Sequence, residues 1–268
     1  MSRADRVAVI GLGAMGLPVA VNLRKAGVDV IGFSRSQAST NRASEAGVPV
    51  ASTLQDVDAH IVLTVLPDMP QVRDVLEGGL RQHLQAGDIL VVMGTVSPLL
   101  MRELHNELAD VGIVAVDAAM SGGDVGAQNA TMSIMFGGPQ DTFDELLPHF
   151  TRIARTIRRL GEAGAGQIAK ACNQVIVAIT LTALAEAITL ARRSGLDTTA
   201  LLDVLQGGLA GSQALTVKRE KIESGNFTPG GRADFQLKDL RFALELAAQT
   251  HSSTPVTHEV AQLFAALV

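Results

Sequence analysis

Residues 6–16 read Arg-Val-Ala-Val-Ile-Gly-Leu-Gly-Ala-Met-Gly, an apolar run that leads directly into a glycine-rich turn. The run predicts a buried strand, and residues 17–26, which end before Gly27, predict a helix. The turn between them matches the pattern G-x-G-x-x-G at Gly11, Leu12, Gly13, Ala14, Met15 and Gly16. Between a strand and a helix this pattern indicates dinucleotide binding. The three glycines allow a tight turn, close approach of the pyrophosphate and close packing of the helix on the strand, and the helix amides bind the phosphates.

Similar apolar runs recur through the first half of the chain, at 28–34, 60–66, 88–94 and 112–118. Near-continuous apolar runs are typical of parallel strands that are covered on both faces. Helical segments such as 98–109 separate the runs, so the alternation predicts a doubly wound, mostly parallel sheet of the Rossmann type. Two more runs, at 131–136 and 156–160, are expected to extend this sheet.

The pattern changes after Gly161, because no alternation typical of strands returns. The second half predicts helices alone, at about 167–194, 198–206, 213–224, 234–250 and 256–267. We therefore expect an α/β chain of two domains. Residues 1–162 would form the dinucleotide-binding Rossmann domain, and residues 163–268 an all-helical substrate and dimerisation domain.

The composition argues against a nucleic-acid partner. The chain has 268 residues, a net charge of −5 and an aromatic share of 3%, with no Trp or Tyr. Aromatic residues are the usual platforms for base stacking, and they are scarce here. The densest basic cluster is read as a solvated face, and it consists of Arg152, Arg155, Arg158 and Arg159.

The single cysteine, Cys172, allows no internal disulfide and fits a reducing compartment. Residues 1–6 are charged and lack the apolar core of a signal peptide. Residues 175–191 form one long apolar stretch, but Glu186 and three threonines interrupt it. We interpret it as a buried helix between domains rather than a membrane span, and we expect a cytoplasmic protein with no membrane partner.

The end of the second predicted strand bears on the choice of cofactor. NAD-binding sites commonly have an acidic residue there, which binds the ribose hydroxyls. This chain has Ser34 followed by Arg35. A guanidinium can pair with a 2′-phosphate, so we favour NADP, with NAD as the alternative. An ordinary exposed arginine at a strand end is the other interpretation.

Three loops follow later strands, at the sheet edge where doubly wound folds bind ligands. Leu66-Pro67-Asp68 and Gly94-Thr95-Val96 are expected to flank the cofactor, with Leu66, Pro67 and Thr95 as contacts. Ser121-Gly122-Gly123 could present a hydroxyl and backbone amides to a substrate carboxylate. Each loop taken alone also fits ordinary turn chemistry.

Lys170 stands in an otherwise apolar helical segment, which makes it the candidate catalytic residue. Asn173 and Gln174 follow it by three and four residues and so share its helix face. Burial lowers the pKa of a lysine and suits proton transfer near neutral pH, whereas a snorkelling lysine is the alternative. The histidines are scattered and Cys172 has no second cysteine, so we predict no metal site.

Four stretches, in chain order, resemble the β-hydroxyacid dehydrogenase family of the 3-hydroxyisobutyrate dehydrogenase type. They are Gly11 to Pro18, Asp117 to Gly123, Gly164 through Lys170 to Asn173, and Lys238-Asp239-Leu240. The resemblance runs through essentially the whole chain.

The resemblance implies an NAD(P)-dependent enzyme that interconverts a small β-hydroxy acid and its semialdehyde. By that resemblance Lys170 is the general acid and base. Ser121, Gly122 and Gly123 hold the substrate carboxylate, helped by Asn173 or Gln174. Thr95 and Lys238 contact the cofactor.

Further stretches at 173–178, 207–212 and 226–230 are similar to those of tartronate semialdehyde reductases, which make glycerate. The alternatives are enzymes of 3-hydroxyisobutyrate, succinic semialdehyde or glyoxylate. Imine reduction also uses this fold, but imine reductases usually replace the lysine. A catalytically silent dinucleotide-binding assembly module is the alternative of another class.

The chain departs from the family pattern at several positions, and these leave the substrate open. Ala119 stands where proline is usual, Val92-Met93-Gly94 where Asp-Met-Ser is common, and Gly231 where the semialdehyde reductases have an aromatic residue. The chain also ends at Val268, one or two helices earlier than the resemblance predicts. The long apolar helix at 167–194 has more apolar surface than one small domain buries easily, so we expect a homodimer or homotetramer.

Overall fold

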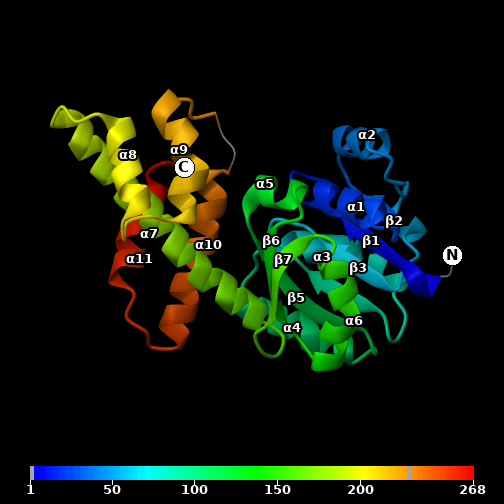
Figure 1. Cartoon of the computed structure of the whole chain (residues 1–268). Helices are drawn as coiled ribbons and strands as arrows, with labels where there is room; N and C mark the ends of the chain where they lie inside the picture. Colours follow the sequence, from blue (N-terminus) through cyan, green and yellow to red (C-terminus); the bar gives the residue numbers. More distant parts are fainter. Residues whose placement is uncertain (1–2, 229–230) are drawn as a thin grey trace. The chain divides into compact units, whose positions relative to one another are not determined.

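The computed structural model describes residues 3–228 and 231–268, which divide into two compact units, Met1–Lys170 and Ala171–Val268. The first unit is a sheet with helices, and the second is helical (Figure 1). Helix α7 (Ala165–Arg193) begins in the first unit and continues into the second. The predicted fold class, a Rossmann-type sheet followed by helices, is confirmed.

A seven-stranded sheet in the order β2-β1-β3-β4-β5-β6-β7 forms the centre of the first unit. Its strands are β1 (Arg6–Ile10), β2 (Asp29–Phe33), β3 (Ile61–Thr64), β4 (Ile89–Val92), β5 (Val114–Ser121), β6 (Met132–Gly137) and β7 (Ala154–Arg159). All neighbouring pairs are parallel except β5 and β6, which run antiparallel. The strand order reverses between β1 and β3, and such a switch point is where doubly wound sheets bind ligands.

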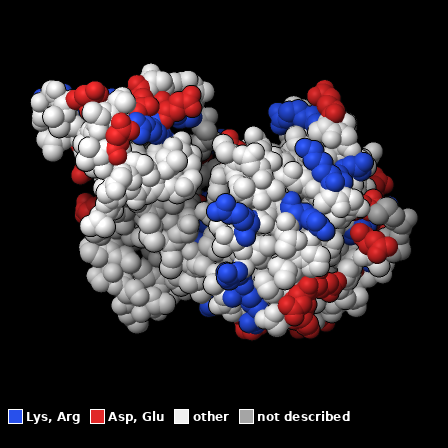
Figure 2. All heavy atoms as spheres, viewed as in Figure 1, with Lys and Arg blue, Asp and Glu red and all other residues white. Residues whose placement is uncertain are grey.

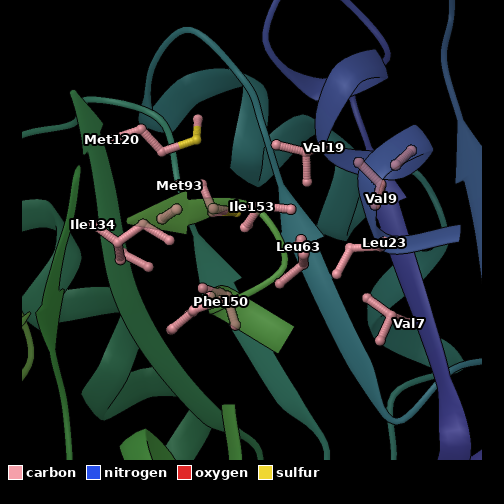
Figure 3. Close-up of a cluster of buried hydrophobic side chains, with 14 of the residues drawn as sticks. Val7, Val9, Val19, Leu23, Leu63, Met93, Met120, Ile134, Phe150 and Ile153 are labelled. Carbon is pink, nitrogen blue, oxygen red and sulfur yellow. The ribbon is translucent and has the colours of Figure 1, made fainter. Parts of the chain in front are cut away.

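Helices cover both faces of the sheet and bury an apolar layer on each. One layer joins β1, β3 and β5 to α1 (Gly16–Lys25), α5 (Gly123–Gln128) and α6 (Gln140–Phe150), and Figure 3 shows part of it. The opposite layer joins the alternate strand residues to α3 (Met69–Glu77) and α4 (Pro98–Ala109). Successive strand side chains point to opposite faces, so a strand covered on both faces needs apolar residues on both, as β4 has throughout.

Short segments complete the first unit and show local stop and start signals. Helix α2 (Gln37–Glu45) is capped by the Ser36 hydroxyl, and α3 begins at Asp68, whose carboxylate accepts from the Met69 amide. Both caps are residues that favour helix starts. Single 3₁₀ turns lie at η1 (Arg3–Asp5), η2 (Leu54–Asp56) and η3 (Leu80–Gln82).

The second unit comprises the rest of α7 together with α8 (Thr198–Gly207), α9 (Gln213–Ser224), α10 (Ala233–Gln249) and α11 (Pro255–Ala265). Two small apolar clusters stabilise it. One joins Ala178 of α7 to α10 and α11, and the other joins Leu184 and Ile188 of α7 to Leu202 of α8 and Leu215 of α9. Helix α7 therefore contributes to both clusters.

Helix α7 is only partly covered within a single chain. Of its most apolar stretch, 22% is buried, and Ile176 and Leu190 are mostly exposed. In the described part of the chain α7 is long and apolar enough to cross a membrane, and a single helix of this kind is a weak indication of a membrane span. The interpretation of this stretch as a buried helix rather than a membrane span stays a prediction, because an oligomer is also expected to cover it.

Candidate active site

The glycine turn after β1 is shaped by the backbone. Gly11 has a φ of 98°, and its amide donates to the carbonyl oxygen of Phe33 at 2.9 Å. A Cβ on Gly16 would overlap the carbonyl oxygen of Gly11. Both positions therefore require glycine for reasons internal to the fold, the first for its conformation and the second for close packing.

Gly13 differs from Gly11 and Gly16, because a Cβ there would meet no described atom of the chain within 4 Å. Nothing in the described protein explains the absence of a side chain, whereas the approach of a phosphate would. Helix α1 starts just beyond, and within the described residues its N-cap, Met15, makes no side-chain hydrogen bond. Open amides at a helix start bind phosphate well, so the turn fits a dinucleotide.

A pocket of about 390 Å³ lies beside this turn. It is lined by Ile10, Gly11, Phe33, Ser34, Arg35, Ser36, Leu66 and Val75. Sequence reasoning selected Gly11, Ser34, Arg35 and Leu66 for cofactor binding, and the fold brings these four together. It did not identify Phe33 and Val75, which add apolar walls of the kind that an adenine ring requires.

The Arg35 guanidinium is the candidate group in this pocket for binding a 2′-phosphate. The Arg35 side chain is 67% exposed, and its Nη1 lies 3.6 Å from a carboxylate oxygen of Asp74 on α3. Exposed ion pairs of this kind contribute little to stability. The guanidinium is therefore available at the pocket edge for an incoming anion.

The Thr95 loop follows β4 and is held by a side chain that sequence reasoning passed over. Gln167, on α7, is 1% exposed. Its Oε1 accepts from the Val96 amide at 3.0 Å, and its Nε2 donates to the Gly94 carbonyl oxygen at 2.9 Å. These bonds fall on either side of Thr95, so the loop is fixed to α7.

A buried carboxylate fixes the start of α7 itself. Asp117 lies on β5, is fully buried, and accepts from the amides of Gly164 at 2.6 Å and Gln167 at 2.8 Å. Burial raises the pKa of Asp117 to about 7, although these amide bonds work in the opposite direction. A lone acidic residue within the apolar run 114–120 was the sequence signal for this role.

The loop at Ser121-Gly122-Gly123 lies where β5 ends and α5 begins. Gly122 and Gly123 have φ values of 130° and 63°, a backbone region that favours glycine. Both glycines are exposed and directly follow the carboxyl end of β5. The arrangement can bind a small anion.

Lys170 lies in the second turn of α7, three residues after Gln167 and therefore on the same helix face. It is one of few charged residues buried in the described structure, with 8% of its surface exposed. A buried lysine requires a purpose or a partner. No group of His, Cys, Asp and Glu among the described residues could hold a metal ion.

Within the helical unit, the other candidate residues form a polar network. The Gln174 Nε2 donates to Asp239 at 2.6 Å, and its Oε1 accepts from Asn173 at 3.1 Å. The Lys238 ammonium lies 3.0 Å from Asp239 and 4.8 Å from the centre of the Phe242 ring. The structure thus brings Asn173, Gln174 and Lys238 together around Asp239, a residue that sequence reasoning quoted but gave no role.

A glycine turn that leaves room for pyrophosphate, an adjoining pocket and a buried lysine define a dinucleotide-binding oxidoreductase of the Rossmann class. Comparison with known families agrees with this. Residues 6–161 match the NAD binding domain of 6-phosphogluconate dehydrogenase, and residues 164–268 match the family described as NAD-binding of NADP-dependent 3-hydroxyisobutyrate dehydrogenase.

Individual relatives narrow the class. The chain is 33% identical to 2-hydroxy-3-oxopropionate reductase of Escherichia coli over 262 residues, which are 97% of this chain and 90% of that protein. It is 32% identical to NAD-dependent L-serine dehydrogenase of Pseudomonas aeruginosa, over 94% of this chain and 88% of that protein. The solved structure of 3-hydroxyisobutyrate dehydrogenase of Mycobacterium tuberculosis with L-serine superposes with a TM-score of 0.87 at 32% identity, covering 98% of this chain and 94% of that one. The chain belongs to the NAD(P)-dependent β-hydroxyacid dehydrogenase family.

The stretch at 226–230 is one of those that resemble tartronate semialdehyde reductases. Its last two residues, 229 and 230, lie outside the described residues.

The first prediction concerns Asp117. Its pKa is 3.8 in the unfolded chain and about 7 in the folded one, so between these values the folded state binds the extra proton. This contribution to stability is therefore fully present below about pH 4 and is lost as pH rises to about 7, with a slope of at most about 1.4 kcal/mol per pH unit. Asp117→Asn should remove this slope. Urea unfolding followed by circular dichroism, at several pH values, measures it.

Asp88 is the matched control. Burial opposes its ionisation, but hydrogen bonds from Arg3 and the Gln85 amide hold the pKa of Asp88 below its ordinary value. Asp88→Asn should therefore alter the pH dependence only in the acid range, with the opposite sign. If the free energy of unfolding depended on pH in the same way for wild type and Asp117→Asn between pH 4 and 7, the raised pKa of Asp117 would be contradicted.

Proposed function

We propose that this chain is an NADP-dependent reductase of a small semialdehyde that carries a carboxylate, with tartronate semialdehyde, reduced to glycerate, as the substrate. The observation that carries this proposal is the placement of Lys170. It is buried on α7, one turn after the residue that holds the Thr95 loop, in a domain whose glycine turn leaves room for phosphates.

Lys170 would supply the proton. NADPH held at the glycine turn would supply the hydride for the carbonyl carbon, and the carbonyl oxygen would then develop negative charge. Lys170 donates a proton from its ammonium to that oxygen and regains one from solvent. In the direction of oxidation, the neutral amine accepts the proton of the hydroxyl group.

The substrate carboxylate is assigned to the Ser121-Gly122-Gly123 loop. Its glycine conformations expose backbone amides, and Ser121 adds a hydroxyl. Asn173 and Gln174 are assigned as further contacts by family resemblance. Lys238 is assigned to the cofactor, together with Leu12, Ala14, Met15, Pro67 and Thr95.

The three relatives reported above have names that give different activities, and these guide the choice of substrate. Sequence similarity to the E. coli 2-hydroxy-3-oxopropionate reductase covers almost the whole chain. The stretches at 173–178 and 207–212 support the same substrate.

We also propose a cytoplasmic location, since the single cysteine of the chain forms no internal disulfide.

The second prediction concerns substrate and cofactor together. Initial rates are measured with tartronate semialdehyde, methylmalonate semialdehyde, succinic semialdehyde and glyoxylate, each with NADPH and with NADH. Tartronate semialdehyde with NADPH should give the highest kcat/KM. A preference for another aldehyde would replace the substrate but keep the reductase. If no aldehyde is reduced while NADPH still binds, the silent binding module is the better interpretation.

Arg35→Ala tests the basis of the cofactor preference. A charge-assisted contact contributes about 1.5–3 kcal/mol, so the variant should lose at least about tenfold in kcat/KM for NADPH and little for NADH. Arg42→Ala is the control, because Arg42 is exposed on α2 and does not line the pocket. A preference of the wild type for NADH, or an equal loss with both cofactors, would contradict the role of Arg35.

The third prediction concerns Lys170. Loss of a general acid costs about 10²–10⁴ in rate, so Lys170→Ala should lose most of its kcat. Its Kd for NADPH should change little, because the phosphates bind at the glycine turn. Titration calorimetry or NADPH fluorescence measures the Kd, since the chain contains no Trp or Tyr.

Two further variants make this test specific. Lys170→Arg should also be inactive, because a guanidinium stays protonated and does not release its proton. Lys25→Ala removes an exposed lysine at the end of α1 and should leave kcat unchanged. If Lys170→Ala kept more than about a tenth of the wild-type kcat, the lysine would not be the general acid.

The fourth prediction concerns assembly. We propose at least a homodimer that buries α7, whose most apolar window is only 22% buried in a single chain. On the face of the helical unit that Figure 2 shows, the charged side chains lie mostly at the upper end. An exposed apolar helix favours association between copies. Light scattering at micromolar concentration should give at least twice the mass of 28.0 kDa, and Leu190→Glu should shift the protein toward monomer. A monomeric wild type would contradict the proposal.

A further inference from the structure

Gln167 makes a pattern of bonds that the chemistry proposed above does not use. Its side chain is buried, and both atoms of its amide bond to one short backbone segment, Gly94 to Val96. Its own backbone amide donates to Asp117. A buried amide costs free energy unless it is hydrogen-bonded, and here every bond goes to a neighbour of the candidate site.

The segment from Gly94 to Val96, which bonds to Gln167, also packs closely against a second loop. A Cβ on Gly94 would overlap the carbonyl oxygen of Leu66, so the Thr95 loop packs directly against the loop after β3. Leu66 lines the pocket beside the glycine turn. The Thr95 loop is therefore held between the pocket wall and Gln167.

Gln167 also lies on the helix that carries Lys170. Residues three apart on a helix occupy the same face, and the intervening turn is fixed by the i to i−4 bonds of α7. A shift of α7 relative to β4 would move Lys170 and break both amide bonds together. The two bonds thus couple the position of the lysine to that of the Thr95 backbone.

We propose that Gln167 is a positioning residue, which sets the Thr95 loop, and through it the nicotinamide end of the cofactor, in register with Lys170. This rests on the proposed roles of Lys170 and Thr95. Gln167 does not touch the reacting atoms. It keeps the proton donor and the hydride donor at the separation that the reaction requires, since a misplacement of about 1 Å can cost about 10²-fold in rate.

The fifth prediction tests this with Gln167→Met, which keeps the side-chain length but removes both hydrogen bonds. In the free protein, amide hydrogen exchange at Val96 should be at least about fivefold faster, because a buried bond of about 1 kcal/mol or more is lost. In the holoenzyme, kcat should fall about 10- to 100-fold. The Kd for NADPH should change little, and the deuterium isotope effect with 4-deuterated NADPH should rise as hydride transfer becomes limiting.

His105→Leu is the matched control. It also removes a bond from a helix side chain to strand backbone, from His105 on α4 to the Ala115 carbonyl oxygen at 2.7 Å, but neither residue bonds to the Thr95 loop or to Gln167. It should lower the unfolding midpoint without changing the isotope effect or exchange at Val96. Gln167→Asn takes the place of Gln167→Met if that variant fails to fold. Its side chain is too short to make both bonds, so it should show the same changes in exchange and kcat.

Several outcomes would overturn the proposal. A folded Gln167→Met or Gln167→Asn with kcat within about twofold of wild type would do so, as would unchanged exchange at Val96. If neither variant folds, Gln167 is a purely structural residue and the proposal is wrong. Failure of the proposed function is distinguishable, because it would appear as inactivity of the wild type over the aldehyde panel, whatever happens at Gln167.

Discussion

The buried carboxylate of Asp117 is the interaction on which the candidate site depends. It lies on β5 and accepts from the amides of Gly164, just before α7, and of Gln167, in the first turn of α7. A helix start leaves backbone amides without partners, and a carboxylate satisfies them with a favourable charge. The cost of burying that carboxylate is seen in the raised pKa of Asp117. The helix that carries Lys170 is thereby attached to the domain that binds the cofactor.

Small residues around this carboxylate make the attachment close. A Cβ on Gly166 would overlap the carbonyl oxygen of Met135 on β6, and one on Gly137 would lie 2.6 Å from a carboxylate oxygen of Asp117. The antiparallel pairing of β5 with β6 places Gly137 directly opposite Asp117. The antiparallel β5–β6 pair therefore places Gly137 and the Met135 carbonyl beside the start of α7, which contains Gly166. These glycines are needed for space rather than for an unusual φ.

The site divides into parts that are built differently. The proposed phosphate-binding part is made of backbone, through the conformation of Gly11, the open space at Gly13 and the amides of α1. The proposed proton donor is a single side chain, Lys170, on a helix whose start is held by long-range bonds of Asp117 and Gln167. Around Asp239, the helical unit gathers its own polar groups. Backbone sites of the first kind tolerate changes in neighbouring side chains, whereas the second kind relies on a few buried polar bonds that are costly to remove.

The sequence by itself determined the local elements and several residues of the pocket beside the glycine turn. Apolar runs, glycines and helix stops predicted the strands and the helices of the second half, because these signals act over a few residues. Sequence reasoning also selected Gly11, Ser34, Arg35 and Leu66, since a glycine turn and a strand end have fixed places in this fold. Only the tertiary structure decided the antiparallel β6, the partial burial of α7 and the hydrogen bonds of Asp117 and Gln167. Asp117 acts on residues 47 and 50 positions away, and Gln167 on residues 71 and 73 positions away. Bonds over such separations leave no periodic pattern in the chain, because they form only when packing brings the partners together.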